Sequence, residues 1–174
     1  MQNKKVLYLV QAAVIAAIYV VLTYFISAFN LASGAIQVRI SEALCVLPFF
    51  TPAAIPGLFL GCLLSNLLTG CIIWDVVFGS LATLLGALGT GLLTGRSAKP
   101  SGSGEKAGPP AWLAPLPPII ANTLIVPFVL RYAYQLPGSV PYFMLTVGIG
   151  EVISCGVLGL ILLKVLSRYK KYLF

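Results

Sequence analysis

The sequence predicts an all-α integral membrane protein in which residues 1–174 form a single domain, a bundle of six transmembrane helices. Hydrophobic residues make up 59% of the chain and charged residues only 9%, whereas about 25% of the residues in soluble domains are charged. The apolar residues occur in long uncharged runs, unlike the alternating pattern of membrane β-strands. A chain of this length has room for about six spans of ~20 residues with short connections.

Prolines, glycines and charged residues divide the apolar sequence into spans. Residues 42–68 are too long for one crossing of a ~30 Å hydrocarbon core at ~1.5 Å per residue, and three prolines interrupt them, so we expect two crossings. Residues 95–110 contain a Ser-Gly-Ser-Gly run and are predicted to form a flexible loop. The predicted spans are residues 6–29, 42–50, 53–68, 75–93, 112–131 and 142–164.

Basic residues predict the orientation of the bundle. With six spans, the N-terminus, the 95–110 loop and the C-terminus share one side of the membrane. Positive charge favours the cytoplasmic side, so this side is predicted to be cytoplasmic. The other side carries only Arg39 and Arg131. The shared side carries the remaining Lys and Arg residues: Lys4, Lys5, Arg96, Lys99, Lys106, Lys164, Arg168, Lys170 and Lys171.

Several function classes are excluded by what the sequence lacks. The net charge of +7 reflects the topology signal, and no basic patch interleaved with aromatic residues indicates nucleic-acid binding. The chain has no histidine, no C-x-x-C pair and no carboxylate cluster with metal-ligand spacing, so neither an enzyme nor a metal site is predicted. Residues 91–97 superficially resemble a phosphate loop, but the spacing is one residue short and Arg96 replaces the lysine.

Polar side chains gather in the outer halves of the predicted spans. A charge beside or inside a membrane span is costly, so it is usually held by a partner or a ligand. Counted along the helices, Asn122 and Glu151 lie on the order of 14 Å below the outer surface. We therefore predict an outward-facing pocket that has these two residues at its floor and residues 30–41 as its roof. The candidate binding residues are Glu151, Asn122, Asn66, Glu42, Arg39, Asp75 and Trp74.

Structural roles remain open for the charged candidates. Glu151 could hydrogen-bond to a neighbouring helix or pair with Arg39 or Arg131 instead of binding a ligand. Glu42 lies three residues after Arg39, and the two could pair with each other. Asp75 opens a predicted span, where a carboxylate also serves as a helix cap.

Structural roles are open for the other candidates too. Asn66 and Asn122 are residues typical of interhelical hydrogen bonds, and Trp74 could anchor the membrane interface or stack on a flat ring. Small residues in the first span predict a surface on which another helix docks, either within the bundle or on a partner protein. These residues are Ala12, Ala13, Ala16 and Ala17.

Four motifs resemble the queuosine-precursor transporter family of QueT type. They are IQVRISEAL at residues 36–44, LPFFTPAAIPGLFLGC at residues 47–62, Ser65-Asn66, and DVVFGSLATL at residues 75–84. The resemblance is strongest over residues 34–90 and rests on the pattern of spans elsewhere. Members of this family are substrate-binding S components of energy-coupling factor (ECF) transporters.

The resemblance implies a six-helix bundle that captures its ligand outside and topples in the membrane when partner proteins hydrolyse ATP. The implied partners are a transmembrane coupling subunit and two ATPase subunits, so the chain itself needs no cofactor. The first-span alanines resemble the face on which S components dock. The implied ligand is a 7-deazaguanine such as preQ1 or preQ0.

A 7-deazaguanine presents adjacent N–H donors, which a carboxylate accepts in a bidentate way. From this chemistry we expect Glu151 or Glu42 to accept these donors, with Asn66 and Asn122 on the remaining edge. An S component for another vitamin or nucleobase is the nearest alternative. A self-sufficient secondary transporter would show an inverted repeat, and we find none. A purely structural subunit would have no need of polar residues gathered on one side.

Overall fold

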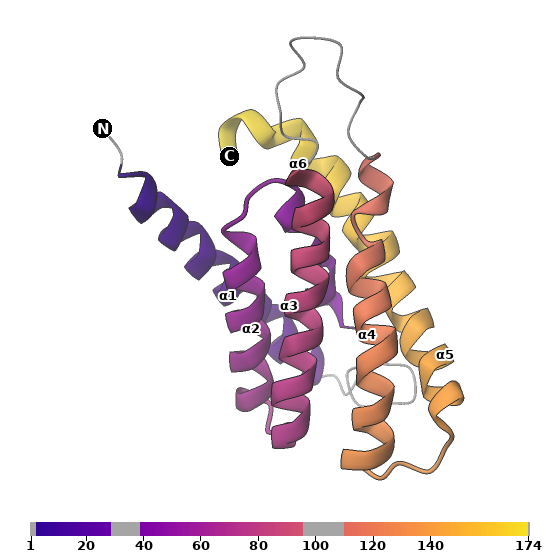
Figure 1. Ribbon diagram of the computed structural model, residues 1–174. Coiled ribbons are helices and arrows are strands. Elements are labelled where there is room, and N and C mark those ends of the chain that lie inside the picture. Colours follow the sequence, from indigo (N-terminus) through magenta and orange to yellow (C-terminus); the bar gives the residue numbers. More distant parts are fainter. Residues whose placement is uncertain (1–2, 29–38, 96–109, 174) are drawn as a thin grey trace.

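The computed structural model describes residues 3–28, 39–95 and 110–173, and every regular element within these residues is a helix (Figure 1). This confirms the all-α prediction for the described part of the chain. The α-helices are joined by 3₁₀ segments (η1, η2) and π segments (η3, η4). The elements are α1 (Lys4–Ala28), η1 (Ile40–Phe49), α2 (Ala54–Leu68), α3 (Ile73–Gly95), η2 (Ala111–Leu113), α4 (Leu116–Phe128), η3 (Val129–Ala133), α5 (Val140–Glu151), η4 (Val152–Leu158) and α6 (Gly159–Leu173).

Each predicted span overlaps helical residues, but the helices differ in length. η1 and α2 are shorter apolar helices of 10 and 15 residues, and α2 would extend only about 22 Å at 1.5 Å per residue. The described residues therefore contain four helical stretches long enough to cross a membrane, and the count of six spans stays a prediction. These stretches are Lys4–Ser27, Ile73–Leu93, Ala111–Ala133 and Val140–Tyr169.

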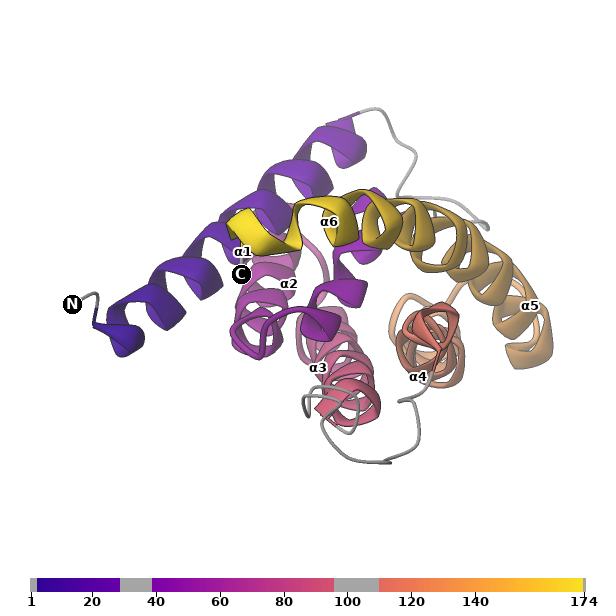
Figure 2. The ribbon, with the colours of Figure 1, turned by 90° about the horizontal axis from the view of Figure 1, so that it is seen from above.

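η1 lies at the centre of the bundle. Its residues 41–48 are all buried, and it contacts α1, α3, η4 and α6 (Figure 2). A helix that is apolar all round is expected to be buried rather than amphipathic. The predicted second span is therefore a core element without a lipid-facing side, and it carries Glu42 into the interior.

α1 and α2 pack closely because small residues line their contact. A Cβ atom added to Gly57 would lie 2.7 Å from the backbone oxygen of Ala12, and one added to Gly61 would lie 3.1 Å from the Cα of Ala16. Glycine therefore permits a helix approach that a larger residue would prevent. This contact places Ala12 and Ala16 inside the bundle, where both are buried.

The four alanines of the predicted docking surface do not share one face. Ala12 and Ala16 pack against α2, the internal role that the sequence had left open, whereas Ala13 and Ala17 are exposed. Residues spaced four apart share a helix face, but neighbouring residues are turned away from each other. A docking surface on α1 would therefore consist of Ala13 and Ala17.

The start of α1 and the end of α6 lie at one end of the bundle, where α3 also ends (Figure 1). The opposite end holds the start of α3 and Arg131 of η3. Both described chain ends thus lie at the same end of the bundle (Figure 1), and the cytoplasmic placement of that end stays a prediction. Arg96, Lys99, Lys106, the 95–110 loop beyond Gly95 and most of the predicted roof (residues 30–38) lie outside the described residues.

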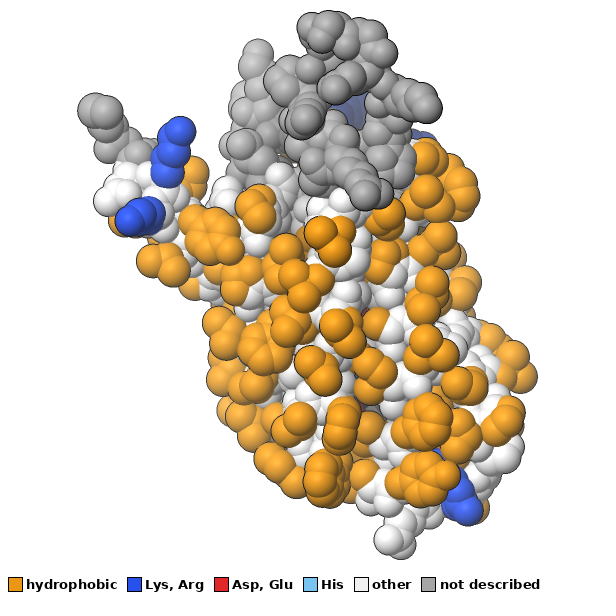
Figure 3. All heavy atoms as spheres, viewed as in Figure 1, with side chains coloured by type: hydrophobic (Ala, Val, Ile, Leu, Met, Phe, Trp, Pro, Cys, Tyr) orange, Lys and Arg blue, Asp and Glu red, His pale blue; other side chains and the backbone are white. Residues whose placement is uncertain are grey.

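Hydrophobic side chains cover most of the described part of the face seen in Figure 3. Large hydrophobic side chains such as Leu9, Val21 and Leu145 are exposed, while polar side chains such as Glu42, Asn66 and Thr90 are buried. An apolar exterior suits a hydrocarbon solvent, in which buried polar groups must find partners inside the protein. The described residues therefore have the pattern of a membrane bundle with a polar interior.

The contact between α1 and α2 predicts the effect of enlarging Gly57. In Gly57→Ala the new methyl group meets a backbone oxygen, so we expect a loss of about 1–3 kcal/mol in stability. The measurement is thermal unfolding of the purified protein in detergent. Gly156→Ala is the matched control, because its added Cβ would make ordinary contacts of 3.7 and 3.8 Å. An equal melting temperature for Gly57→Ala and wild type would contradict the close packing.

Candidate functional site

Glu42 is held inside the bundle by donors from several elements. The side chain is 1% exposed. The Tyr19 hydroxyl of α1 donates a hydrogen bond to Oε1, and the Cys45 thiol of η1 donates to Oε2 at 3.0 Å. The Asn122 amide of α4 donates to Oε2 at 3.4 Å. A carboxylate with two oxygens accepts about four hydrogen bonds, so Glu42 is close to fully satisfied.

Glu151 is less well satisfied than Glu42. It ends α5, where the helix passes into the π segment η4, and such π segments are frequent at functional sites. Its side chain is 8% exposed, and Oε2 has no hydrogen-bond partner in the described structure. Asn122 and Glu151 line the same small cavity. One buried carboxylate oxygen is therefore available as an acceptor.

A small cavity brings together the predicted floor of the site. Its volume is about 10 Å³, which is room for about one water molecule. Four of its six lining residues had been predicted from the sequence as binding residues, and the other two are apolar. The lining residues are Arg39, Glu42, Asn122, Val126, Val147 and Glu151.

Arg39 joins the cavity to a second polar cluster. Its Nη2 atom lies 3.6 Å from Oδ2 of Asp75, the ion pair that the structure describes for Arg39, so the partner is not Glu42. The Tyr134 hydroxyl donates to the same oxygen at 3.0 Å. Burial, followed by the Asp75 carboxylate, raises the pKa of Tyr134. The phenol therefore keeps its proton and serves as a donor.

Asn66 supports this second cluster rather than the cavity. Its Nδ2 atom donates to the backbone oxygen of Asp75 at 3.4 Å and to the Cys62 sulfur at 3.7 Å. The contact with Asp75 joins α2 to α3, which is the interhelical role that the sequence had left open for asparagine. Asn66 is buried but does not line the cavity.

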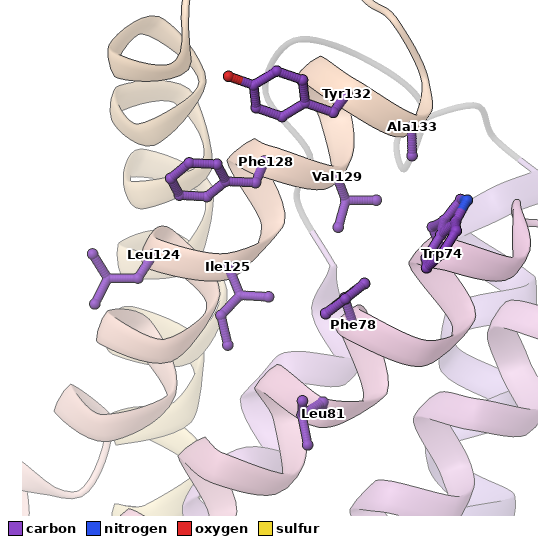
Figure 4. Close-up of a pocket in the computed structure, with 9 residues that line it drawn as sticks. All are labelled: Trp74, Phe78, Leu81, Leu124, Ile125, Phe128, Val129, Tyr132 and Ala133. Atoms are coloured by element: carbon purple, nitrogen blue, oxygen red, sulfur yellow. The ribbon is translucent and has the colours of Figure 1, made fainter.

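Trp74 lies apart from both polar clusters. Its side chain is 56% exposed and stacks on Phe78 at 6.0 Å between ring centroids. Both rings line a larger groove of about 510 Å³ between α3 and α4, facing Phe128 and Tyr132 (Figure 4). The groove is mainly apolar and lacks the convergent polar groups that orient a hydrogen-bonding ligand. Trp74 and Tyr132 are residue types typical of a membrane interface.

The sequence prediction missed two tyrosines that bind the carboxylates. Tyr19 lies in the first span, and Thr23, one turn further on, donates a hydrogen bond to Ser41 at 2.8 Å. A hydroxyl in an apolar span needs a partner inside the protein, and this signal could have identified Tyr19. Tyr134 follows η3 in a connection, where its spacing gives no indication of a contact with Asp75.

The fold and the site define a polytopic helical membrane protein with a buried polar cavity. The model of the QueT transporter family matches residues 9–168, so the chain belongs to this family. It is a family of transporters rather than enzymes, as the motifs at residues 36–84 had indicated. The queuosine precursor transporter QueT of Lactococcus lactis subsp. cremoris (strain MG1363) is 37% identical over 86 residues, which cover 49% of this chain. The chain matches only half (50%) of that relative's length, and no solved structure matches it.

The ion pair between Arg39 and Asp75 predicts non-additive effects on stability. Arg39→Gln and Asp75→Asn each leave one buried charge without its partner, so each is expected to destabilise the protein. The double variant should lose less than the sum, with a coupling of about 0.5–3 kcal/mol in a double-mutant cycle. The measurement is unfolding in detergent. Pairing Asp75→Asn with Arg168→Gln, near the other end of the bundle, should give additive losses. Additivity in both cycles would contradict the ion pair.

Proposed function

We propose that this protein takes up a queuosine precursor as the substrate-binding S component of an ECF transporter. Two facts support the proposal: the chain belongs to the QueT transporter family, and the Lactococcus lactis relative is named a queuosine precursor transporter. The proposed ligand is a 7-deazaguanine such as preQ1 or preQ0. The proposed setting is a prokaryotic plasma membrane, with six spans and both termini cytoplasmic.

The observation that carries this proposal is the meeting of Glu42, Asn122 and Glu151 at one buried cavity. The guanine-like edge of a 7-deazaguanine has adjacent N–H donors, and a carboxylate accepts such a pair in a bidentate way. An asparagine amide offers both a donor and an acceptor to the remaining edge. The three side chains thus provide the hydrogen-bonding groups that a flat polar base needs.

Binding requires the walls of this cavity to separate. Pockets for small molecules have volumes of about 300–1,000 Å³, and the cavity here has a volume of about 10 Å³. The Asn122–Glu42 hydrogen bond crosses between α4 and η1 and is long, at 3.4 Å. It is the longest of the described hydrogen bonds to Glu42. A base that supplies its own donors can therefore replace it.

Energy for transport would come from partner subunits. The sequence contains no nucleotide-hydrolysis motif, which fits a division of labour between this chain, a coupling subunit and two ATPases. The exposed face of α1 that carries Ala13 and Ala17 is the proposed contact with the coupling subunit. Methyl-sized side chains allow close helix approach within a membrane.

The proposed binding site predicts loss of affinity when its carboxylates are neutralised. In Glu42→Gln and Glu151→Gln, the affinity for preQ1 should fall about tenfold or more, because a hydrogen bond to a charged group is lost. Calorimetry or tryptophan fluorescence measures this, with guanine and biotin as comparison ligands. Ser167→Ala, on α6 and remote from the cavity, should bind as wild type does. Normal binding by both carboxylate variants would contradict the site.

The proposed docking surface predicts a different defect. Replacing Ala13 and Ala17 with Phe should keep ligand binding but prevent copurification of ATPase activity from the native host, because the bulky rings block helix approach. The control replaces Val157 and Ile161 with Phe, which enlarges two exposed side chains on η4 and α6. Equal ATPase recovery with both variants would contradict docking at α1.

A further inference from the structure

We propose that the ligand carries a primary ammonium group in addition to its guanine-like edge, and that Glu151 is the residue that receives this cation. The inference rests on the proposed function and narrows its ligand. Among 7-deazaguanines it selects the aminomethyl base preQ1 over the nitrile base preQ0, since these differ at one substituent and only the former is a cation at neutral pH.

The first argument is the balance of charge around the cavity. Arg39 is the cation of the lining, and Asp75 already compensates it at 3.6 Å. Glu42 and Glu151 are the two carboxylates of the lining, and the described residues give neither an ion pair. A buried charge without a partner is costly. Two neighbouring buried carboxylates are ionised together only when a cation compensates them, and a cationic ligand supplies that cation whereas a neutral base does not.

The second argument is the difference between the two carboxylates. Tyr19, Cys45 and Asn122 donate to Glu42. By contrast, Oε2 of Glu151 has no partner within the described part of the chain, although the residue is more than nine-tenths buried. An ammonium is a stronger donor to a carboxylate than a neutral N–H group. A cation in this cavity therefore makes its most favourable interaction at Oε2 of Glu151.

The third argument is that Glu42 can still accept the edge of the base. Its contact with Asn122 is long at 3.4 Å, and the Cys45 thiol is a weak donor, so N–H groups of a base can replace both. Val126 and Val147 supply the apolar part of the lining. Apolar walls lower the local dielectric and strengthen each charge interaction.

The test compares preQ1 with preQ0 on the full-length protein in detergent, using calorimetry. We expect wild type to bind preQ1 about tenfold or more tightly than preQ0, the difference expected for one hydrogen bond to a charged group. Equal affinities would overturn the inference and leave the proposed function in place. If a folded protein bound neither base, the proposed function would fail together with the inference.

Variants of Glu151 then locate the cation. Glu151→Gln should lower the affinity for preQ1 to the level of the affinity for preQ0. It should change the affinity for preQ0 little, because the amide keeps the shape of the side chain without its charge. Glu151→Asp keeps the charge and should keep the preference for preQ1. If Glu151→Gln lowered the affinities for both bases equally, Glu151 would contact the ring edge. This result would overturn its assignment to the ammonium. Ser167→Ala should retain the wild-type ratio.

Discussion

The hydrogen bonds to the Glu42 carboxylate constrain the arrangement of the whole bundle. A carboxylate that is 1% exposed needs donors from inside the protein. One donor comes from η1 itself, and the other two come from α1 and α4, which are distant in the sequence. α1 and α4 must therefore both pack against η1 at the Glu42 side chain. A bundle with η1 at its periphery would leave this carboxylate in hydrocarbon without its donors, which is costly.

The glycine contact between α1 and α2 supports the same site from a distance. A Cβ atom on Gly61 would lie 2.8 Å from Cβ of Tyr19, the residue whose hydroxyl binds Glu42. The close approach of the two helices thus fixes the position of a donor to the carboxylate. Packing of small residues and burial of charge are usually treated as separate features of membrane proteins. Here the first determines the geometry of the second.

The sequence predicted which half of the bundle holds the polar residues, but it could not predict which way each one faces. Counting residues along the spans placed Asn122 and Glu151 about 14 Å below the span ends that hold Arg39 and Glu42, whereas the structure places all four at one cavity. Trp74 was predicted at the outer end of its span, and the structure places it at the start of α3, where it lines a separate groove. The sequence also could not predict that Ala12 faces the bundle interior and Ala13 faces outward. Neighbouring residues on a helix are rotated by about 100° from each other. Helix rotation depends on the packing of partners, which no single span encodes.

The two polar clusters differ in how fully their groups are hydrogen-bonded. This difference distinguishes a cluster that supports the fold from one that is suited to bind a ligand. In the second polar cluster, Asp75 has both an ion pair and a hydrogen bond, so it joins elements without requiring a ligand. In the cavity, Oε2 of Glu151 has no hydrogen-bond partner among the described residues. A buried group left unsatisfied costs about 1–3 kcal/mol, and a structure selected for stability alone would have removed it or filled its site. A ligand that donates a hydrogen bond to this oxygen removes the penalty. The same free energy then favours the bound state.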